Sequence, residues 1–291
     1  MNSCPDCNNE ALIKFGQYIY YSNIFHINYC PVCGLYFSDT LLSHEVISNH
    51  FENTYNDESY FIDKRKNIFE HIAQLTDEHT IENGNILDIG GGKGHLLSMI
   101  QKTRADLMVN LNDLSEYSCK FCTETYGIQS FCCAMPDLHK INKCYETILL
   151  IDVIYYEQKL NDMFETINKL LISNQGTVII RVPNKLRLII IYQKLLNVFG
   201  SQKNIFFQSK VKYFNPEHIY IFSQPYLMNK LLKTGFNNIR FIPSPMLRKD
   251  QAIESFVGQL FFKAANAISR LTFGKLILTP SMIIIAKKSD G

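Results

Sequence analysis

Short apolar runs alternate with helical patterns along most of the chain after residue 80. In the helical patterns, apolar residues recur every three to four positions. The apolar runs predict strands over 85–89, 107–112, 128–133, 147–151, 177–182 and 282–287. The helical patterns cover 95–102, 161–172 and 225–234. Strands that alternate with helices in this way are typical of an α/β fold, in which crossover helices connect the strands of a parallel sheet.

The first predicted strand runs into a glycine-rich turn that leads directly to a helix. The turn contains Asp88 and three alternating glycines, Gly90, Gly92 and Gly94. Such a turn lets a ligand approach the backbone closely, and the helix that follows offers unpaired amides. The spacing does not fit the dinucleotide fingerprint, because the sixth position counted from Gly90 is His95 rather than glycine.

This arrangement of an acid and glycines resembles the first motif of class I methyltransferases. The resemblance implies a Rossmann-like sheet, mostly parallel with an antiparallel last strand, and S-adenosylmethionine as cofactor. The loop, including Gly91, would pack against the methionyl and adenosyl parts, and Asp88 would help to hold the amino end. Asp113 ends the second strand about 20 residues beyond the loop, where an acid can accept hydrogen bonds from both ribose hydroxyls.

The next two strand ends depart from the pattern of this family. An acid that contacts the adenine amine commonly follows the third strand, but none is present directly after it here. Adenine recognition is therefore assigned to Met135 and backbone amides, with Asp137 as a weaker candidate. After the fourth strand Asp152 is a candidate cofactor ligand. Tyr155 and Tyr156 stand where related enzymes often carry a Glu-His pair, which excludes a histidine base at that place.

Three side chains are candidates for chemistry at the methyl acceptor: His218, Tyr156 and Glu157. Methyl transfer from a sulfonium is an in-line displacement, so a base is needed only if the acceptor must lose a proton. Tyr156 and Glu157 follow the fourth strand, and His218 lies in a segment that resembles the substrate region of the family. A structural role for His218 fits the sequence as well as a role in the pocket does, and Tyr156 fits shaping of the pocket better than the role of a base.

Two Cys-x-x-Cys pairs near the start of the chain predict a zinc site. They are Cys4 with Cys7, and Cys30 with Cys33, separated by a segment that can form a hairpin over 11–29. Two such knuckles supply the four soft ligands of a closed tetrahedral zinc site. Four cysteine ligands leave no open position for water or substrate, so the predicted zinc ion is structural.

The second knuckle also takes part in a more specific resemblance. Cys30 to Phe37, with Tyr55 and Tyr60 further on, resembles a zinc-bearing subgroup of methyltransferases in polysaccharide and deoxysugar biosynthesis. We therefore divide the chain into a zinc ribbon at 1–42 and a methyltransferase domain at 43–291. The resemblance implies methylation of an oxygen or carbon of a sugar, nucleotide-linked or lipid-linked, or of another small biosynthetic intermediate.

The segment 185–215 combines apolar and basic residues. Between Arg181 and Pro216 the sequence has seven basic residues and no acidic one. A lid over the substrate is the preferred interpretation, ahead of a membrane-surface helix and a homodimer surface. The cations would suit a phosphate-bearing substrate, although a solvated charged face fits the pattern as well.

Composition and charge narrow the choice of partners. The chain has 291 residues with 46% hydrophobic residues and a formal charge of +2, which indicates a folded protein without a strong overall field. Lys14 is the only basic residue between Met1 and Thr40, so the ribbon is a poor docking module for nucleic acid. An RNA methyltransferase and a cofactor-binding scaffold without catalysis remain the alternatives.

The chain shows neither a secretory pattern at its start nor an apolar run of the roughly 20 residues that span a bilayer. We therefore expect a cytoplasmic protein without a transmembrane segment, for which contact with a membrane surface stays open. The sequence leaves the oligomeric state undecided.

Overall fold

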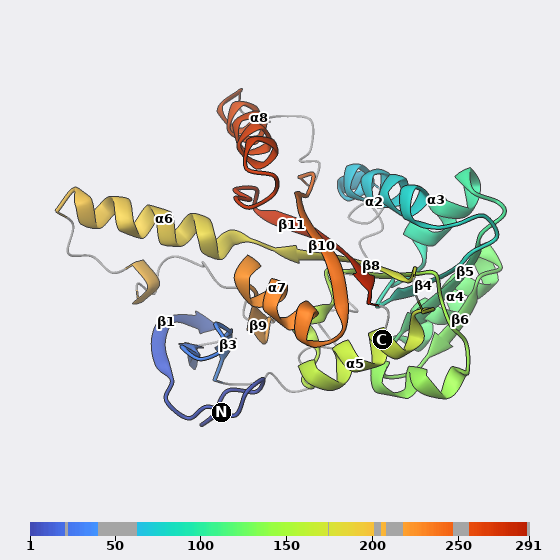
Figure 1. The fold of residues 1–291 in the computed structure, drawn as a ribbon, viewed down its shortest axis with the longest axis horizontal. Coiled ribbons are helices and arrows are strands. Elements are labelled where there is room, and N and C mark those ends of the chain that lie inside the picture. Colours follow the sequence, from blue (N-terminus) through green and yellow to red (C-terminus); the bar gives the residue numbers. More distant parts are fainter. Residues whose placement is uncertain are drawn as a thin grey trace.

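The chain forms a seven-stranded and a four-stranded β-sheet, shown in Figure 1 as a computed structural model. The structure describes residues 1–20, 23–39, 63–173, 175–200, 205–207, 218–246 and 256–289.

The larger sheet has seven strands in the order β10-β11-β8-β7-β4-β5-β6. The strands are β4 (Asn85–Ile89), β5 (Met108–Asp113), β6 (Gln129–Cys132), β7 (Thr147–Ile151), β8 (Thr177–Pro183), β10 (Phe236–Pro243) and β11 (Ser281–Lys288). Strands β4 to β8 pair in parallel, whereas β11 runs antiparallel to both of its neighbours. The predicted fold class, a mostly parallel α/β sheet with an antiparallel last strand, is confirmed.

Helices cover both faces of this sheet (Figure 1). The described α-helices are α2 (Lys66–His79), α3 (His95–Thr103), α4 (Glu116–Tyr126), α5 (Leu160–Leu170), α6 (Lys185–Val198), α7 (Gln224–Lys233) and α8 (Phe256–Leu271), of which α6 and α8 project away from the sheet. Short 3-10 helices follow β6, β7 and α6, at η2 (Met135–Ile141), η3 (Ile154–Tyr156) and η4 (Ile205–Phe207).

Alternating side chains of the central strands supply two separate cores. In β7, Ile148 and Leu150 pack with α5 and α7, while Leu149 and Ile151 pack with α2 and α3. All five residues of β7 are buried, because a strand in the middle of a parallel sheet is covered on both faces. This two-sided burial explains why the strands could be recognised as continuous apolar runs.

The smaller sheet has the order β1-β2-β3-β9 and is antiparallel throughout. Its first three strands are β1 (Ile13–Tyr20), β2 (Asn23–Tyr29) and β3 (Tyr36–Ser38), and the first two form the predicted hairpin. The fourth strand, β9 (Tyr220–Ile221), comes from the second half of the chain. The N-terminal region is thus joined to the rest of the molecule by a shared sheet.

A common core reinforces this junction. Leu35 and Phe37 are completely buried in the same cluster as Phe222 and Tyr226. The domain boundary expected near residue 42 lies outside the described residues.

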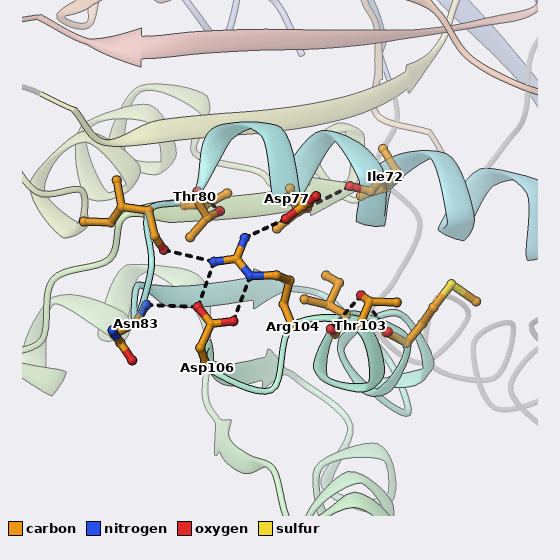
Figure 2. A network of polar contacts seen from close by, with 12 residues as sticks. Ile72, Asp77, Thr80, Asn83, Thr103, Arg104 and Asp106 are labelled. Carbon is orange, nitrogen blue, oxygen red and sulfur yellow. Dashed lines mark hydrogen bonds and ion pairs between the residues drawn. The ribbon is translucent and has the colours of Figure 1, made fainter.

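A polar network connects helix α2 to the turns that precede β4 and β5, at the end of the sheet where these two strands begin (Figure 2). Arg104 donates two hydrogen bonds to the carboxylate of Asp106, at 2.8 and 2.7 Å, and a third to Asp77 at 2.6 Å. Asp106 also accepts the amide of Asn83 at 3.0 Å. Paired guanidinium and carboxylate groups of this kind give a defined geometry, so the network orients the turns that precede β4 and β5.

Among the described helices, none is both long enough and apolar enough to cross a membrane.

Candidate functional site

The glycine turn after β4 adopts a conformation that other residues would strain. Gly90, Gly92 and Gly94 have positive φ angles of 69°, 57° and 78°. Space is restricted as well, because a Cβ atom on Gly90 would lie 2.5 Å from a methyl group of Val153. A Cβ atom on Gly94 would lie 2.3 Å from the sulfur of Cys122. The turn is therefore pressed between the segment after β7 and helix α4, and its backbone is fixed in place.

Asp88 lies buried beneath this turn. Asp88 is 2% exposed. A Cβ atom on Gly91 would lie 2.5 Å from Oδ2 of Asp88, so the turn packs directly on this carboxyl group. Within the described part of the chain, Oδ1 of Asp88 has no hydrogen-bond partner. Burial raises the pKa of Asp88 to about 8, and the nearby carboxylate of Asp113 adds to the shift. A cation beside this carboxyl group would lower its pKa and favour the ionised form.

Asp113 connects the glycine turn with helix α4. Its Oδ2 accepts the amide of Gly92 at 2.8 Å, and its Oδ1 accepts the amide of Ser115 at 2.8 Å. Ser115 caps α4 by accepting the amide of Ser118 at 3.2 Å. Burial raises the pKa of Asp113. Since each carboxylate oxygen can accept a second hydrogen bond, Asp113 retains capacity for a pair of ligand hydroxyls.

The two adenine candidates after β6 have different surroundings. Met135 is 7% exposed and belongs to the large core beside the strand ends. Asp137 forms a surface ion pair with Lys140 at 2.6 Å. The side chain of Asn112 fixes the path of this segment by donating to the carbonyl oxygens of Phe131 and Cys133, both at 2.9 Å.

Asp152 follows β7 in the left-handed region, with a φ angle of 62°. Asparagine and aspartate tolerate this region better than most residues, and such strain is concentrated at functional sites. One carboxylate oxygen accepts from both Arg65 and Arg181, whereas Oδ1 has no partner among the described residues. Burial would raise the pKa of Asp152, but the guanidinium groups of Arg181 and Arg65 outweigh burial and hold the pKa below its ordinary value.

This pair of arginines was not predicted from the sequence. Arg181 was expected among the cations of the lid, but its side chain lies in β8, is 8% exposed, and donates from Nε to the hydroxyl of Ser244 at 2.8 Å. The parallel register places Ile151, the residue before Asp152, opposite Arg181. The sequence does contain one indication of the contact between Arg181 and Asp152. Arg181 lies inside an apolar strand, and the neighbouring strand is followed by an aspartate. Arg65 precedes α2, and nothing in its local sequence indicated the contact.

The structure brings His218 and Tyr156 together beside the end of β7. The ring of His218 lies 3.8 Å from the ring centroid of Tyr155 and 5.6 Å from that of Tyr156. Tyr155, which is 5% exposed, therefore forms the closer contact. Glu157 accepts the backbone amide of Lys159 at 3.1 Å.

The ribbon holds the segment that carries His218. The amide of Ile219 donates to the carbonyl of Tyr155 at 3.0 Å, and the carbonyl of Ile219 accepts the amide of Ser38 at 2.9 Å. The following residues pair with β3. A continuous chain of backbone hydrogen bonds thus connects the ribbon, the His218 segment and the turn after β7.

The four predicted metal ligands converge in the ribbon. The sulfur atoms of Cys4, Cys7, Cys30 and Cys33 all lie within 4.8 Å of one another. Two sulfur pairs, Cys4 with Cys33 and Cys7 with Cys30, are 3.5 Å apart. The edge of a tetrahedral zinc site with Zn–S bonds of about 2.3 Å would be about 3.8 Å. The arrangement could therefore hold one zinc ion with little movement.

The two knuckles share a backbone design. Asn8 and Gly34, each directly after the second cysteine of its pair, have positive φ angles of 58° and 82°. Their amides donate to the carbonyl oxygens of Cys4 and Cys30, both at 2.9 Å. Burial raises the pKa of the Cys4 thiol to about 11, so the thiolate form at neutral pH requires a compensating cation.

Helix α6 begins the segment that was predicted as a lid. Ile189 is buried in a cluster with the β1–β2 hairpin and η4. The described part of the segment therefore packs against the ribbon, while residues 201–204 and 208–215 lie outside the described residues. Lys203, Lys210 and Lys212 of the basic stretch are among them.

Comparison with known proteins gives a family match. Residues 60–240 match the family model described as a methyltransferase domain, which is more than half of the 291 residues. A search of curated proteins gave no significant match.

Solved structures share the fold. A protein described as an S-adenosylmethionine-dependent methyltransferase from Clostridium acetobutylicum is similar with a TM-score of 0.51 and 15% identity, over 83% of this chain and 99% of that chain. The plantazolicin methyltransferase BpumL, in complex with a monoazolic desmethylPZN analog and SAH, is similar with a TM-score of 0.51 and 17% identity. That similarity covers 84% of this chain and 90% of the other.

Proposed function

The chain belongs to the methyltransferase domain family and is an enzyme of this class, and we propose that it methylates an oxygen or carbon of a sugar or other small biosynthetic intermediate, using S-adenosylmethionine. The observation that carries the proposal is the fixed glycine turn with Asp88 beneath it and Asp113 beside it. These groups offer a backbone surface, a buried carboxyl group and a second carboxylate at one edge of the sheet.

S-adenosylmethionine supplies an electrophilic methyl group on a sulfonium. In our proposal the unpartnered Oδ1 of Asp88 accepts the amino end of the cofactor, which removes the cost of a buried oxygen without a hydrogen bond. Asp113 accepts the ribose hydroxyls with its remaining lone pairs, and Met135 packs against adenine. Asp152 offers its Oδ1 from the end of β7, with the paired guanidinium groups keeping it ionised.

The acceptor side is assigned to the residues beside η3. His218 would orient an acceptor hydroxyl or remove its proton, and its contacts with Tyr155 and Tyr156 support a fixed ring position. Tyr156 and Glu157 are the alternatives for this role. A glycan acceptor that carries a phosphate would be compatible with the basic side chains of α6, Lys185 and Lys194, which are exposed.

The four cysteines are proposed to bind one structural zinc ion. The closed set of four sulfur ligands favours a structural role over a catalytic one. In this interpretation the metal stabilises the ribbon, and the ribbon in turn supports the segment that carries His218.

Calorimetric titration with S-adenosylmethionine tests the cofactor assignment. Asp113→Ala should weaken binding by about 1 to 3 kcal/mol, because the ribose hydroxyls would lose their partner. Asp77→Ala is the matched control, since that carboxylate pairs with Arg104 at the opposite end of the sheet and its loss should leave the affinity unchanged. Equal affinities in wild type and Asp113→Ala would contradict the ribose assignment, and tight NAD binding would overturn the cofactor.

Formation of S-adenosylhomocysteine with nucleotide sugars tests the reaction. His218→Ala should lower turnover roughly 100-fold while cofactor affinity is retained. His218→Gln should recover much of the rate if the ring only orients the acceptor, and little if it takes a proton. His71→Gln on α2 is a control outside the site. Turnover with RNA alone would favour the RNA alternative, and no turnover with any acceptor would favour a scaffold.

A further inference from the structure

Helix α6 presents two apolar faces, of which the ribbon covers only one. Leu186 and Ile189 are buried, the latter against the β1–β2 hairpin. At about 100° per residue, the exposed apolar residues of the helix and the residue after it lie within an arc of about 120° on another side. These residues are Ile191, Tyr192, Leu195, Val198 and Phe199, and the last two are 79% and 82% exposed.

Basic residues border this exposed face. At the same helical spacing, Lys185 and Lys194 lie on opposite sides of the apolar arc, and both side chains are exposed. No acidic residue occurs between Arg181 and Gly200. The free face of α6 is therefore apolar in its middle and cationic at its borders.

Helix α8 repeats this pattern at a separate place in the sequence. Leu260, Phe261 and Leu271 are 58%, 43% and 80% exposed and lie within one arc of the helix. Lys263 and Arg270 are exposed at one border of that arc. The sequence has no acidic residue from Phe256 to Ser289. Single exposed apolar residues are common on protein surfaces, but here they gather on one face of each of two helices. Such a patch indicates an interaction surface.

Both helices project from the body of the molecule near the strands β8, β10 and β11 (Figure 1). Projecting helices can lay an apolar side against another surface without rearrangement of the sheet.

We propose that the exposed faces of α6 and α8 dock the enzyme on an anionic lipid bilayer. An amphipathic helix with large apolar residues bordered by Lys and Arg inserts its apolar face at the lipid headgroups, while its cations bind anionic lipids. A second copy of this chain fits less well, because a symmetric contact would place the same cations against each other. The centre of a protein interface is also usually depleted in lysine.

Co-sedimentation of the full chain with vesicles tests the proposal. Binding should be strong with vesicles of phosphatidylcholine and phosphatidylglycerol, weak with phosphatidylcholine alone, and reduced by salt. Leu195→Asp/Phe199→Asp should lower the partition coefficient for anionic vesicles by about tenfold or more, because two apolar anchors are lost and negative charge is added. Leu260→Asp/Leu271→Asp should have the same effect.

The control is Ile81→Asp/Leu232→Asp, which changes two residues of similar exposure, 52% and 54%, outside both helices. It should bind vesicles as the wild type does. Lys194→Glu/Lys263→Glu gives a second test that leaves the apolar residues in place, and it should weaken binding to anionic vesicles only. This pair decides the matter if the aspartate variants do not fold.

Three results would overturn the proposal. The first is no binding of the wild type to anionic vesicles at low salt. The second is equal binding of the wild type and the Lys194→Glu/Lys263→Glu variant. The third is a wild-type dimer in sedimentation velocity that Leu195→Asp/Phe199→Asp converts to monomer without any vesicle binding, which would assign the face to a second copy of the chain.

Discussion

At the scale of single residues, burial and the nearby carboxylate of Asp113 disfavour the charged form of Asp88. Its folded pKa of about 8, raised by burial and by Asp113, compares with about 4 for an unperturbed aspartate. Between these two values the folded protein keeps a proton that the unfolded chain releases. The contribution of Asp88 to the unfolding free energy therefore decreases as the pH rises from about 4 to about 8.

Replacement of this carboxyl group should remove the decrease in unfolding free energy that Asp88 causes as the pH rises. Asp88→Asn keeps the shape but cannot ionise, so its unfolding free energy relative to wild type should increase from pH 5 to pH 8. Urea unfolding of both proteins at the two pH values measures the difference. Asp137→Asn, at the surface, should show no such increase. A difference that stays constant between the two pH values would show that Asp88 is already ionised at pH 5.

Cofactor binding should also report on Asp88. A bound ammonium group favours the ionised carboxylate, so binding of S-adenosylmethionine at pH 7 should release a proton from Asp88. Calorimetric binding enthalpies in Tris and in phosphate buffer should therefore differ in proportion to the buffers' ionisation enthalpies. Asp88→Asn should abolish most of this difference even where it retains weak binding. An unchanged buffer dependence would place the amino end elsewhere.

Some residues of the candidate site are positioned by local features of the sequence, and others by contacts between distant segments. The glycine turn and Asp113 could be located from the sequence, because strand, turn and spacing are local features. Arg65 and Arg181 could not, since their shared contact with Asp152 joins three distant segments. The ring contact between His218 and Tyr155 is likewise a tertiary contact. The sequence suggested His218 only through resemblance to a family segment.

At the scale of elements, β4 to β8 and β11 were predicted to within one residue, whereas β9 and β10 were not predicted. β10 lies at the edge of the large sheet, and only Phe236 and Phe241 among its residues are buried, so it lacks a continuous apolar run. β9 has two residues and exists as a strand because β3 lies beside it. No local pattern can indicate such a strand, because tertiary contact decides its conformation.

The pairing of β9 with the ribbon predicts an effect of metal removal on the acceptor side. Purified protein should contain about one zinc per chain, and Cys4→Ser/Cys7→Ser should lose it. Hydrogen exchange at Ile219, whose amide donates to the carbonyl oxygen of Tyr155, should then become faster, because this segment would lose the support of β3 on its other side. Exchange in β4 and β5 should change little, and S-adenosylmethionine affinity should be retained. Unchanged exchange at Ile219 would separate the metal from the His218 segment, and full zinc content would place the metal elsewhere.

At the scale of the whole molecule, the ribbon is built into the rest of the protein rather than attached to it. Asp6, inside the first knuckle, forms an ion pair with Lys230 of α7 at 2.5 Å, and Asn161 of α5 donates to the backbone carbonyl of Asp6 at 3.2 Å. Lys230 is 5% exposed, so loss of its partner would leave a buried charge uncompensated. The shared sheet, the shared core and this ion pair all oppose separate unfolding of the two parts.

We therefore expect the ribbon and the large sheet to unfold in one transition. Release of zinc, followed with a chromogenic chelator, should coincide with the loss of helical circular dichroism across a urea titration. Leu35 is completely buried and packs in the common core. Leu35→Ala should lower the unfolding free energy by about 2 to 5 kcal/mol, and the urea midpoints of both signals should decrease together. Val32→Ala is the control in the same knuckle, because its side chain is 70% exposed and its loss should have little effect. If Leu35→Ala shifts zinc release to lower urea while the helical signal keeps its wild-type midpoint, the ribbon unfolds independently and cannot stabilise the large sheet.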